Sequence, residues 1–428
     1  MEQVNPYWFI IAASVVVIIS YFFNLVSRRT NFPSVLLLLI LGMLIKSGLI
    51  LAGVPSFNLD SVLELLGIVG LIMIVLEAAL DLKFSKEKAP LIFKALIIAL
   101  LSLTTGILTI TLLIDQYLDS GMLTAMIYAI PISIVSSAII IPSVVNFKEE
   151  QREFMVYEAT FSDILGILFF YFTIESAHFE NAGILAVSVL ANIFITVIAS
   201  FVLSVILIFL FQRIKTQVKL FLLLSVLIVF YSIGKLLHLS SLIIILVFGL
   251  MLENKEAVFD RFFKKYVVEE ALNHIHVNFK LITLETSFII RTFFFVIFGM
   301  TITLASLFDI EVIFLSVLIT GIFLGLRYVL LRIILRRRFR EILFLIPRGL
   351  ITILLFYSIP PEFQDPAFDP GILFLTILFT SIIMTISLLH QKWQQRLKVI
   401  RKEHVYEVYG RFIPEEYVPG QQPDEPVD

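Results

Sequence analysis

Long apolar runs separated by short polar breaks extend from Asn5 to His390, and this alternation is the strongest pattern in the chain. A helix that crosses a bilayer needs about 20 mostly apolar residues. Thirteen runs approach or exceed that length, so the pattern predicts an all-α integral membrane protein with about thirteen transmembrane helices. The predicted spans are 6–26, 33–50, 62–81, 90–114, 123–145, 154–173, 183–211, 219–236, 239–252, 281–304, 311–333, 341–359 and 371–390.

Composition agrees with this pattern and excludes a water-soluble fold. Of the 428 residues, 59% are hydrophobic and only 15% are charged, whereas soluble domains carry about 25% charged residues. The net charge of −2 gives no argument for a nucleic-acid partner. The chain has no Cys, so disulfides and thiolate metal sites are excluded.

The basic residues predict the orientation, because cytoplasmic loops accumulate Lys and Arg. One set of alternating breaks, together with the tail, holds 25 of the 32 basic residues, while the opposite breaks hold none. We therefore expect the N-terminus outside and the C-terminus in the cytoplasm. The residues before the first span lack the basic region of a cleaved signal, so we expect this helix to be retained.

The longest internal polar stretch, 253–280, divides the chain into a first membrane part, 1–252, and a second one, 281–390. Its mixture of apolar and charged residues is typical of an amphipathic linker on the cytoplasmic face. Residues 391–428 form a cytoplasmic tail that is charged and then Pro-rich, and we expect its end to be disordered. No sequence repeat is visible, although this division permits an inverted structural repeat.

Charged side chains inside the predicted spans are costly in a bilayer, so each one indicates a function or a buried pair. A rise of about 1.5 Å per residue places Glu158, Arg327 and Arg348 at one level, nearer the cytoplasm than the midplane. An unpaired charge at this depth would be far more expensive than a paired one. We therefore predict an ion pair between Glu158 and Arg327.

Asp163 lies deeper, close to the expected midplane, with no basic residue assigned to it. Thr160 can share its helical face, and Ser162 precedes it. A lone carboxylate beside hydroxyl groups can bind a small cation or a proton. The alternative is a structural Asp163 that is hydrogen-bonded to a neighbouring helix.

Two predicted spans carry prolines, which remove a backbone donor and can unwind a helix. In the fifth span the residues concerned are Pro131, Ser136, Ser137 and Pro142. The twelfth span has a comparable break at 346–349. One interrupted helix in each half indicates a transporter site, because unwound backbone offers carbonyl oxygens to an ion.

Five stretches, in this order, resemble the monovalent cation/proton antiporter superfamily, which includes the sodium/proton exchangers. They are LEAALDLK (76–83), SSAIIIP (136–142), YEATFSDILGIL (157–168), FFFVIFG (293–299) with GLRYVLLR (325–332), and IPRGLITILL (346–355). The resemblance implies an inverted-repeat antiporter fold with crossing helices at 123–145 and 341–359. It also implies core and dimerisation domains, a homodimer, and a multi-pass position in the plasma (inner) membrane.

In that family an Asp that ends a motif on the sixth helix alternately carries the cation and the proton, and Asp163 falls on this position. Ser162 departs from the pattern, since the family has Asn or Asp there. Glu158 and Arg327 match an ion pair of the electroneutral branch, which implies exchange of one cation for one proton. The bundle of helices four to six and eleven to thirteen is expected to move against the remaining helices.

The resemblance and the residue pattern together give a set of candidate site residues. The expected ion-binding residues are Asp163, Ser162, Thr160, Ser136 and Ser137, and the expected metal is the transported monovalent cation at Asp163. The expected supporting or entrance residues are Glu77, Arg348 and Arg291. Glu77 has an equally strong alternative as an interfacial acid near Lys83, and Arg348 is expected to bond opened backbone carbonyls.

We expect no cofactor and no enzymatic activity. The expected substrates are Na⁺, or K⁺ or Li⁺, and H⁺. The other transport hypotheses are K⁺/H⁺ efflux and sodium-coupled solute transport. An intramembrane enzyme is disfavoured because the six His residues all lie at or outside the expected membrane boundaries, and a channel is disfavoured because buried acids and broken helices suit an occluded site.

Overall fold

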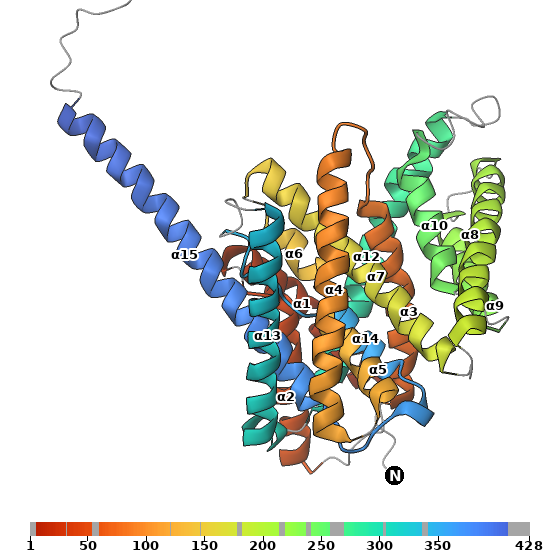
Figure 1. Cartoon of the computed structure of the whole chain (residues 1–428), viewed down its shortest axis with the longest axis horizontal. Helices are drawn as coiled ribbons and strands as arrows, with labels where there is room; N and C mark the ends of the chain where they lie inside the picture. Colours follow the sequence, from red (N-terminus) through yellow and green to blue (C-terminus); the bar gives the residue numbers. More distant parts are fainter. Residues whose placement is uncertain are drawn as a thin grey trace, which may run out of the picture.

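The computed structural model describes residues 6–30, 32–53, 60–119, 121–145, 147–177, 182–213, 219–236, 241–256, 269–302, 305–335 and 341–409. Within these ranges every regular element is a helix, and the long helices form one bundle (Figure 1). Nine of the described helices are long and apolar enough to cross a membrane, and three shorter apolar helices accompany them. The predicted all-α membrane fold is confirmed.

Each predicted span falls on a helix of the described chain. The helices are α1 (Pro6–Thr30), α2 (Ser34–Leu51), α3 (Asp60–Asp81), α4 (Ala89–Leu118), α5 (Met122–Ser133), α6 (Ser137–Ser143), α7 (Glu149–Ser176), α8 (Ala182–Arg213), α9 (Lys219–Leu236), α10 (Ser241–Glu253), α12 (Glu269–Thr301), α13 (Ile310–Leu335), α14 (Leu350–Tyr357) and α15 (Gly371–Tyr409).

Helix packing separates the molecule into two groups. In the first group α12 packs on α2 and α3, α10 packs on α3, α8 and α9, and α1 packs on α2; we call these seven helices the scaffold. In the second group α4 packs on α5, α7 and α13, α7 also packs on α6, and α13 packs on α15; with α14, these helices are the core bundle. The two groups meet where α3 contacts α7 and α14.

Small residues let α2 and α12 approach closely inside the scaffold. A Cβ on Gly42 would lie 2.1 Å from the carbonyl oxygen of Val296, and one on Gly299 would lie 2.3 Å from that of Leu39. In lipid, helices gain most from such close packing, because burying apolar side chains away from the hydrocarbon gives little driving force. The two glycines therefore account for the tightest contact within the scaffold.

The fifth predicted span is interrupted between its two prolines. α5 ends at Ser133, residues 134–136 are non-helical, and α6 begins at Ser137. Pro131 and Pro142 lie inside the two half-helices, and each removes one backbone donor from its helix. The carbonyl and amide groups of the non-helical segment are thereby free to bond elsewhere.

The twelfth predicted span is helical only in its second half. Residues 341–344 form turns, residues 345–349 have no regular structure, and α14 follows. This segment crosses the break in the fifth span, where the amide of Ser136 donates to the carbonyl of Pro347 at 2.9 Å. A Cβ on Gly349 would lie 2.5 Å from the Ser136 hydroxyl, so the crossing requires glycine at this position.

Two helices extend beyond the predicted spans. α12 begins at Glu269, so the last part of the stretch 253–280 continues directly into a membrane helix. α15 continues to Tyr409, well past the predicted end at His390, and projects away from the bundle (Figure 1). The remaining parts of the expected linker and tail that lie outside the described residues are 257–268 and 410–428.

Candidate functional site

A single buried carboxylate on α7 lies against the broken fifth span. Asp163 is 1% exposed, and its Oδ2 accepts a hydrogen bond from the backbone amide of Ser137 at 3.1 Å. Ser137 is the first residue of α6, so the carboxylate faces the positive end of a half-helix. The second oxygen, Oδ1, has no hydrogen-bond partner among the described residues. A buried carboxylate oxygen without a partner is costly, and a cation or a proton would satisfy it.

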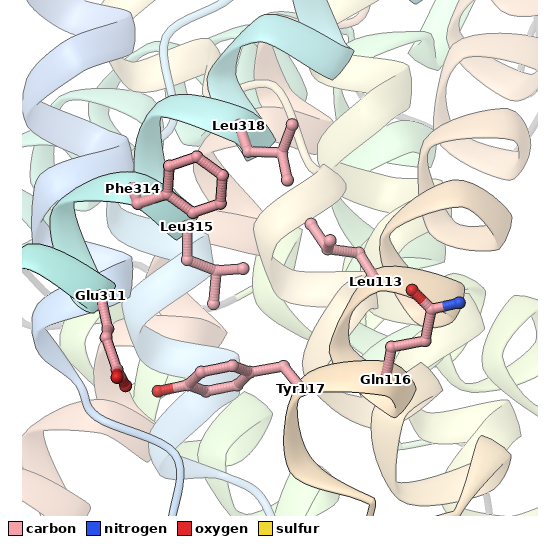
Figure 2. Close-up of a pocket in the computed structure, with 7 residues that line it drawn as sticks. All are labelled: Leu113, Gln116, Tyr117, Glu311, Phe314, Leu315 and Leu318. Atoms are coloured by element: carbon pink, nitrogen blue, oxygen red, sulfur yellow. The ribbon is translucent and has the colours of Figure 1, made fainter.

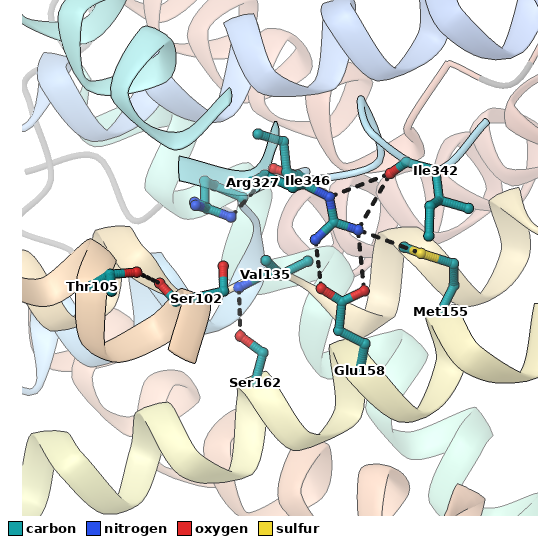
Figure 3. A network of polar contacts seen from close by, with 10 residues as sticks. Ser102, Thr105, Val135, Met155, Glu158, Ser162, Arg327, Ile342 and Ile346 are labelled. Atoms are coloured by element: carbon teal, nitrogen blue, oxygen red, sulfur yellow. Dashed lines mark hydrogen bonds and ion pairs between the residues drawn. The ribbon is translucent and has the colours of Figure 1, made fainter. Parts of the chain in front are cut away.

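Ser162, the residue before Asp163, holds the non-helical segment in place. Its hydroxyl accepts a hydrogen bond from the amide of Val135 at 3.0 Å (Figure 3). This bond satisfies an amide that the break in the helix leaves without an intrahelical partner. The structure therefore gives Ser162 a role in shaping the backbone beside the carboxylate.

The other candidate hydroxyls differ in where they point. The Thr160 hydroxyl donates to the carbonyl of Val156 in its own helix at 2.8 Å, and no described contact joins Thr160 to Asp163. Ser136 lies in the non-helical segment itself, and Ser137 places both its amide and its hydroxyl beside the Asp163 carboxylate.

Glu158 and Arg327 form a bidentate ion pair between α7 and α13 (Figure 3). Arg327 Nη1 donates to Glu158 Oε1, and Nη2 donates to Oε2 at 3.1 Å. Both side chains are 2% exposed. The same guanidinium donates to the carbonyl of Ile342 at 3.3 Å, which anchors the turn before the second crossing segment.

Arg348 lies in the second crossing segment and has no carboxylate partner among the described residues. Its Nη1 donates to the carbonyl of Ile346 at 3.3 Å, and its guanidinium lies 3.9 Å from the ring centroid of Phe323. The backbone amide of Arg348 donates to the Thr380 hydroxyl at 3.2 Å. Arg348 thus bonds an opened carbonyl, while its Nε stays without a partner in the described chain.

A cavity of about 370 Å³ lies between α6 and the scaffold helices α1, α2, α3 and α12. Its core-bundle wall includes Ala138 and Pro142, and its scaffold wall includes Glu77, Asp81 and Arg291. Ala138 directly follows the residue whose amide bonds the Asp163 carboxylate. The cavity therefore leads from the end of α3 that is predicted to be cytoplasmic towards the buried carboxylate.

On the opposite side of Asp163 the core bundle and the scaffold are joined by polar contacts that the sequence pattern did not reveal. The Tyr171 hydroxyl on α7 lies beside the Tyr231 hydroxyl on α9. Lys235 Nζ lies 4.7 Å from the ring centroid of Tyr171. The hydroxyls of Thr301 on α12 and Tyr357 on α14 are 3.2 Å apart.

The connection between α3 and α4 is attached to α7. The Tyr157 hydroxyl donates to the carbonyl of Lys83 at 2.7 Å, and Lys88 forms an ion pair with Glu153. The hydrogen bond to Glu153 raises the pKa of Lys88. This connection is one of the covalent links between scaffold and core bundle, and these contacts hold it against the core bundle.

A second cavity, of about 400 Å³, lies between the facing ends of α4 and α13 (Figure 2). Figure 2 shows its apolar upper walls and the Tyr117 hydroxyl pointing towards the Glu311 carboxylate. The lining residues are Leu113, Gln116, Tyr117, Glu311, Phe314, Leu315 and Leu318. None of them contacts Asp163, so we treat this cavity as separate from the ion site.

The crossed and broken helices, the buried carboxylate and the cavity define a membrane transporter. The family described as "Sodium/hydrogen exchanger, transmembrane" matches residues 12–390. The chain therefore belongs to the sodium/hydrogen exchanger family, as the resemblance of its motifs predicted. It is a multi-pass membrane transporter of the antiporter class and not an enzyme. No curated protein matches the sequence.

Two solved structures have a similar fold. One is the structure of the sodium proton antiporter MjNhaP1 from Methanocaldococcus jannaschii at pH 8, with a TM-score of 0.67 and 17% identity over 89% of this chain and 95% of that chain. The other is an electron-microscopy map of the same antiporter, with a TM-score of 0.62 and 18% identity over 97% of this chain and 100% of that chain. The predicted antiporter fold is confirmed.

Proposed function

We propose that this protein exchanges one monovalent cation, Na⁺, for one proton across the plasma (inner) membrane, and that Asp163 carries either ion. The observation that carries the proposal is the unpartnered Oδ1 of a carboxylate that is 1% exposed, at the crossing of two broken helices. A single carboxylate cannot hold a proton and a cation on the same oxygen at once. Competition at that oxygen couples the two fluxes.

The ion-binding set is Asp163 with oxygen atoms of Ser136, Ser137, Ser162 and Thr160. Asp163 Oδ1 supplies the charge. The serines of the break lie beside it, and their hydroxyl and carbonyl oxygens are ligands that alkali cations accept. Ser162 and Thr160 already make hydrogen bonds, and each hydroxyl oxygen keeps a lone pair that a cation can use.

The ion pair supports electroneutral exchange. Arg327 compensates Glu158 through two hydrogen bonds, so this carboxylate has no free charge to carry an additional ion. Asp163 is then the one carboxylate of α7 at depth that changes its charge. One cation moves in one direction for each proton that moves in the other.

Alternating access follows from movement of the core bundle against the scaffold. The cavity beside α6 and the polar contacts of Tyr171 and Tyr231 on the other side support an inward-facing state, with the N-terminus outside and the C-terminus in the cytoplasm. α1 exposes large apolar side chains such as Trp8 and Phe9. We infer that this face contacts lipid and a second copy of the chain in a homodimer.

The test is cation-driven proton flux in reconstituted vesicles. Wild-type protein is expected to move protons when Na⁺ is added, and Asp163→Asn is expected to abolish this flux. Asp119→Asn is the matched control, because Asp119 lies beyond the end of α4 with φ 52°, a conformation that Asn tolerates. Normal exchange by Asp163→Asn would overturn the proposal, and parallel titrations with K⁺ and Li⁺ identify the preferred cation.

A further inference from the structure

The scaffold wall of the cavity beside α6 carries two acids, and each is bonded to a basic residue of α12. Glu77 accepts hydrogen bonds from the Ser287 hydroxyl at 2.6 Å and from Arg291 Nη2 at 3.3 Å. Asp81, one turn further towards the end of α3, accepts from Lys280 Nζ at 3.0 Å. Both carboxylates of this wall are therefore paired with positively charged side chains of α12.

The Glu77–Arg291 contact differs from the buried pair of the core bundle. It joins one nitrogen to one oxygen at 3.3 Å, and its side chains are 18% and 21% exposed. The Glu158–Arg327 pair is bidentate and 2% exposed. A single long hydrogen bond at the edge of a cavity is weak and exchangeable, because water and ions can replace either partner.

The contact lies on the route that a cation would take from the cytoplasm. Glu77 and Arg291 line the cavity opposite Ala138, and Ala138 follows Ser137, which bonds Asp163. Glu77 is also close enough to Asp163 for their charges to interact. A cation that approaches Asp163 through this cavity passes a carboxylate that Arg291 already neutralises.

We propose that Arg291 is a tethered counter-charge that sets the apparent cation affinity of the cytoplasm-facing site. With the cavity empty, its guanidinium neutralises Glu77. When a cation enters, it replaces Arg291 as the partner of the Glu77 carboxylate, so Arg291 and the cation compete for Glu77. This inference rests on the proposed exchange function and deepens it by naming a residue that determines affinity without touching the transported ion.

The proposal makes the two partners act in opposite directions. Without the Arg291 charge, Glu77 attracts cations into the cavity, and KM for Na⁺ on that side should fall. Without the Glu77 charge, Arg291 repels cations, and KM should rise. A unit charge that lines the approach to the ion site is expected to change KM by about three- to tenfold in each direction. The double variant should return close to the wild-type KM.

The experiment measures initial rates of proton flux against Na⁺ on the cytoplasmic side of oriented proteoliposomes. The variants are Glu77→Gln, Arg291→Gln, the double variant and Arg291→Lys, which keeps the charge and should keep KM near the wild-type value. Opposite shifts in KM, with kcat changing less than KM, are the expected result. If the pair only stabilised the scaffold, both single substitutions would shift KM in the same direction, and that outcome would overturn the proposal.

A chemical version of the test does not depend on the folding of Arg291→Gln. The chain has no Cys, so Arg291→Cys can be modified selectively. Aminoethyl methanethiosulfonate restores a positive charge and should raise KM again, while methyl methanethiosulfonate adds a neutral group and should leave KM low. Equal effects of both reagents contradict the proposal. A wild-type protein without Na⁺-driven proton flux would instead refute the proposed exchange function itself.

Discussion

Replacing Arg327 with Met removes a guanidinium that is 2% exposed and leaves the Glu158 carboxylate buried without its partner. Breaking a buried pair in this way costs about 3–5 kcal/mol, because the remaining charge is desolvated and uncompensated. Arg327 also donates two hydrogen bonds to the carbonyl of Ile342, so its loss releases the turn before the second crossing segment. We therefore expect Arg327→Met to lower the free energy of unfolding by about 4 kcal/mol.

The assay is reversible denaturant unfolding in detergent micelles, followed by circular dichroism. Glu158→Gln in the Arg327→Met background removes the orphaned charge, so the double variant should recover part of the lost stability. Lys88→Met, which breaks a partly exposed pair with Glu153, is the control and should change stability far less. A loss below about 1 kcal/mol for Arg327→Met, the range of exposed pairs, would show that the buried pair with Glu158 does not stabilise the fold as expected.

Three further substitutions test other parts of the structure. Gly299→Ala brings a Cβ to 2.3 Å from the carbonyl oxygen of Leu39, so it should destabilise the scaffold by about 1–3 kcal/mol in thermal unfolding. Gly321→Ala is the control, because Gly321 has open space around it, and it should have little effect in the same assay. Ser162→Ala leaves the buried amide of Val135 without its acceptor, so it should lower the free energy of unfolding by about 1–3 kcal/mol. Ser162→Asn keeps an acceptor and should lower it less in the same assay. Tyr231→Phe removes the polar contact with Tyr171 between scaffold and core bundle. In that background Ser358→Cys should react faster with an impermeant maleimide added from outside, and an unchanged rate would contradict a barrier at this contact.

Much of the fold follows from the sequence because its signals are local. Apolar run length predicted a helix at each span except the first half of 341–359, and prolines predicted both interruptions, since these effects need no knowledge of neighbouring helices. Counting rise along the helices also placed Glu158 and Arg327 at one level, where the structure joins them. The turns at 341–344 were not predicted, because an apolar run that includes Ile342 and Leu345 has the same pattern whether it is helical or not.

The remaining details depend on rotation of helices about their axes and on tertiary contacts, which a single sequence does not reveal. Thr160 shares the face of Asp163 by spacing, yet its hydroxyl bonds its own helix, as Thr commonly does. Glu77 and Arg291 are far apart in the chain, and nothing in the sequence pairs them. Tyr171 and Tyr231 lie in apolar runs where aromatic residues are frequent, so no sequence signal distinguishes their contact.

The most direct test of competition at Asp163 is proton release when a cation binds to purified protein in weakly buffered detergent solution. Addition of Na⁺ is measured with a pH-sensitive dye, and bound cation is measured in parallel. We expect about one proton released for each cation bound by the wild type, and neither release nor binding by Asp163→Asn. Cation binding without proton release, or release of protons by Asp163→Asn, would contradict it.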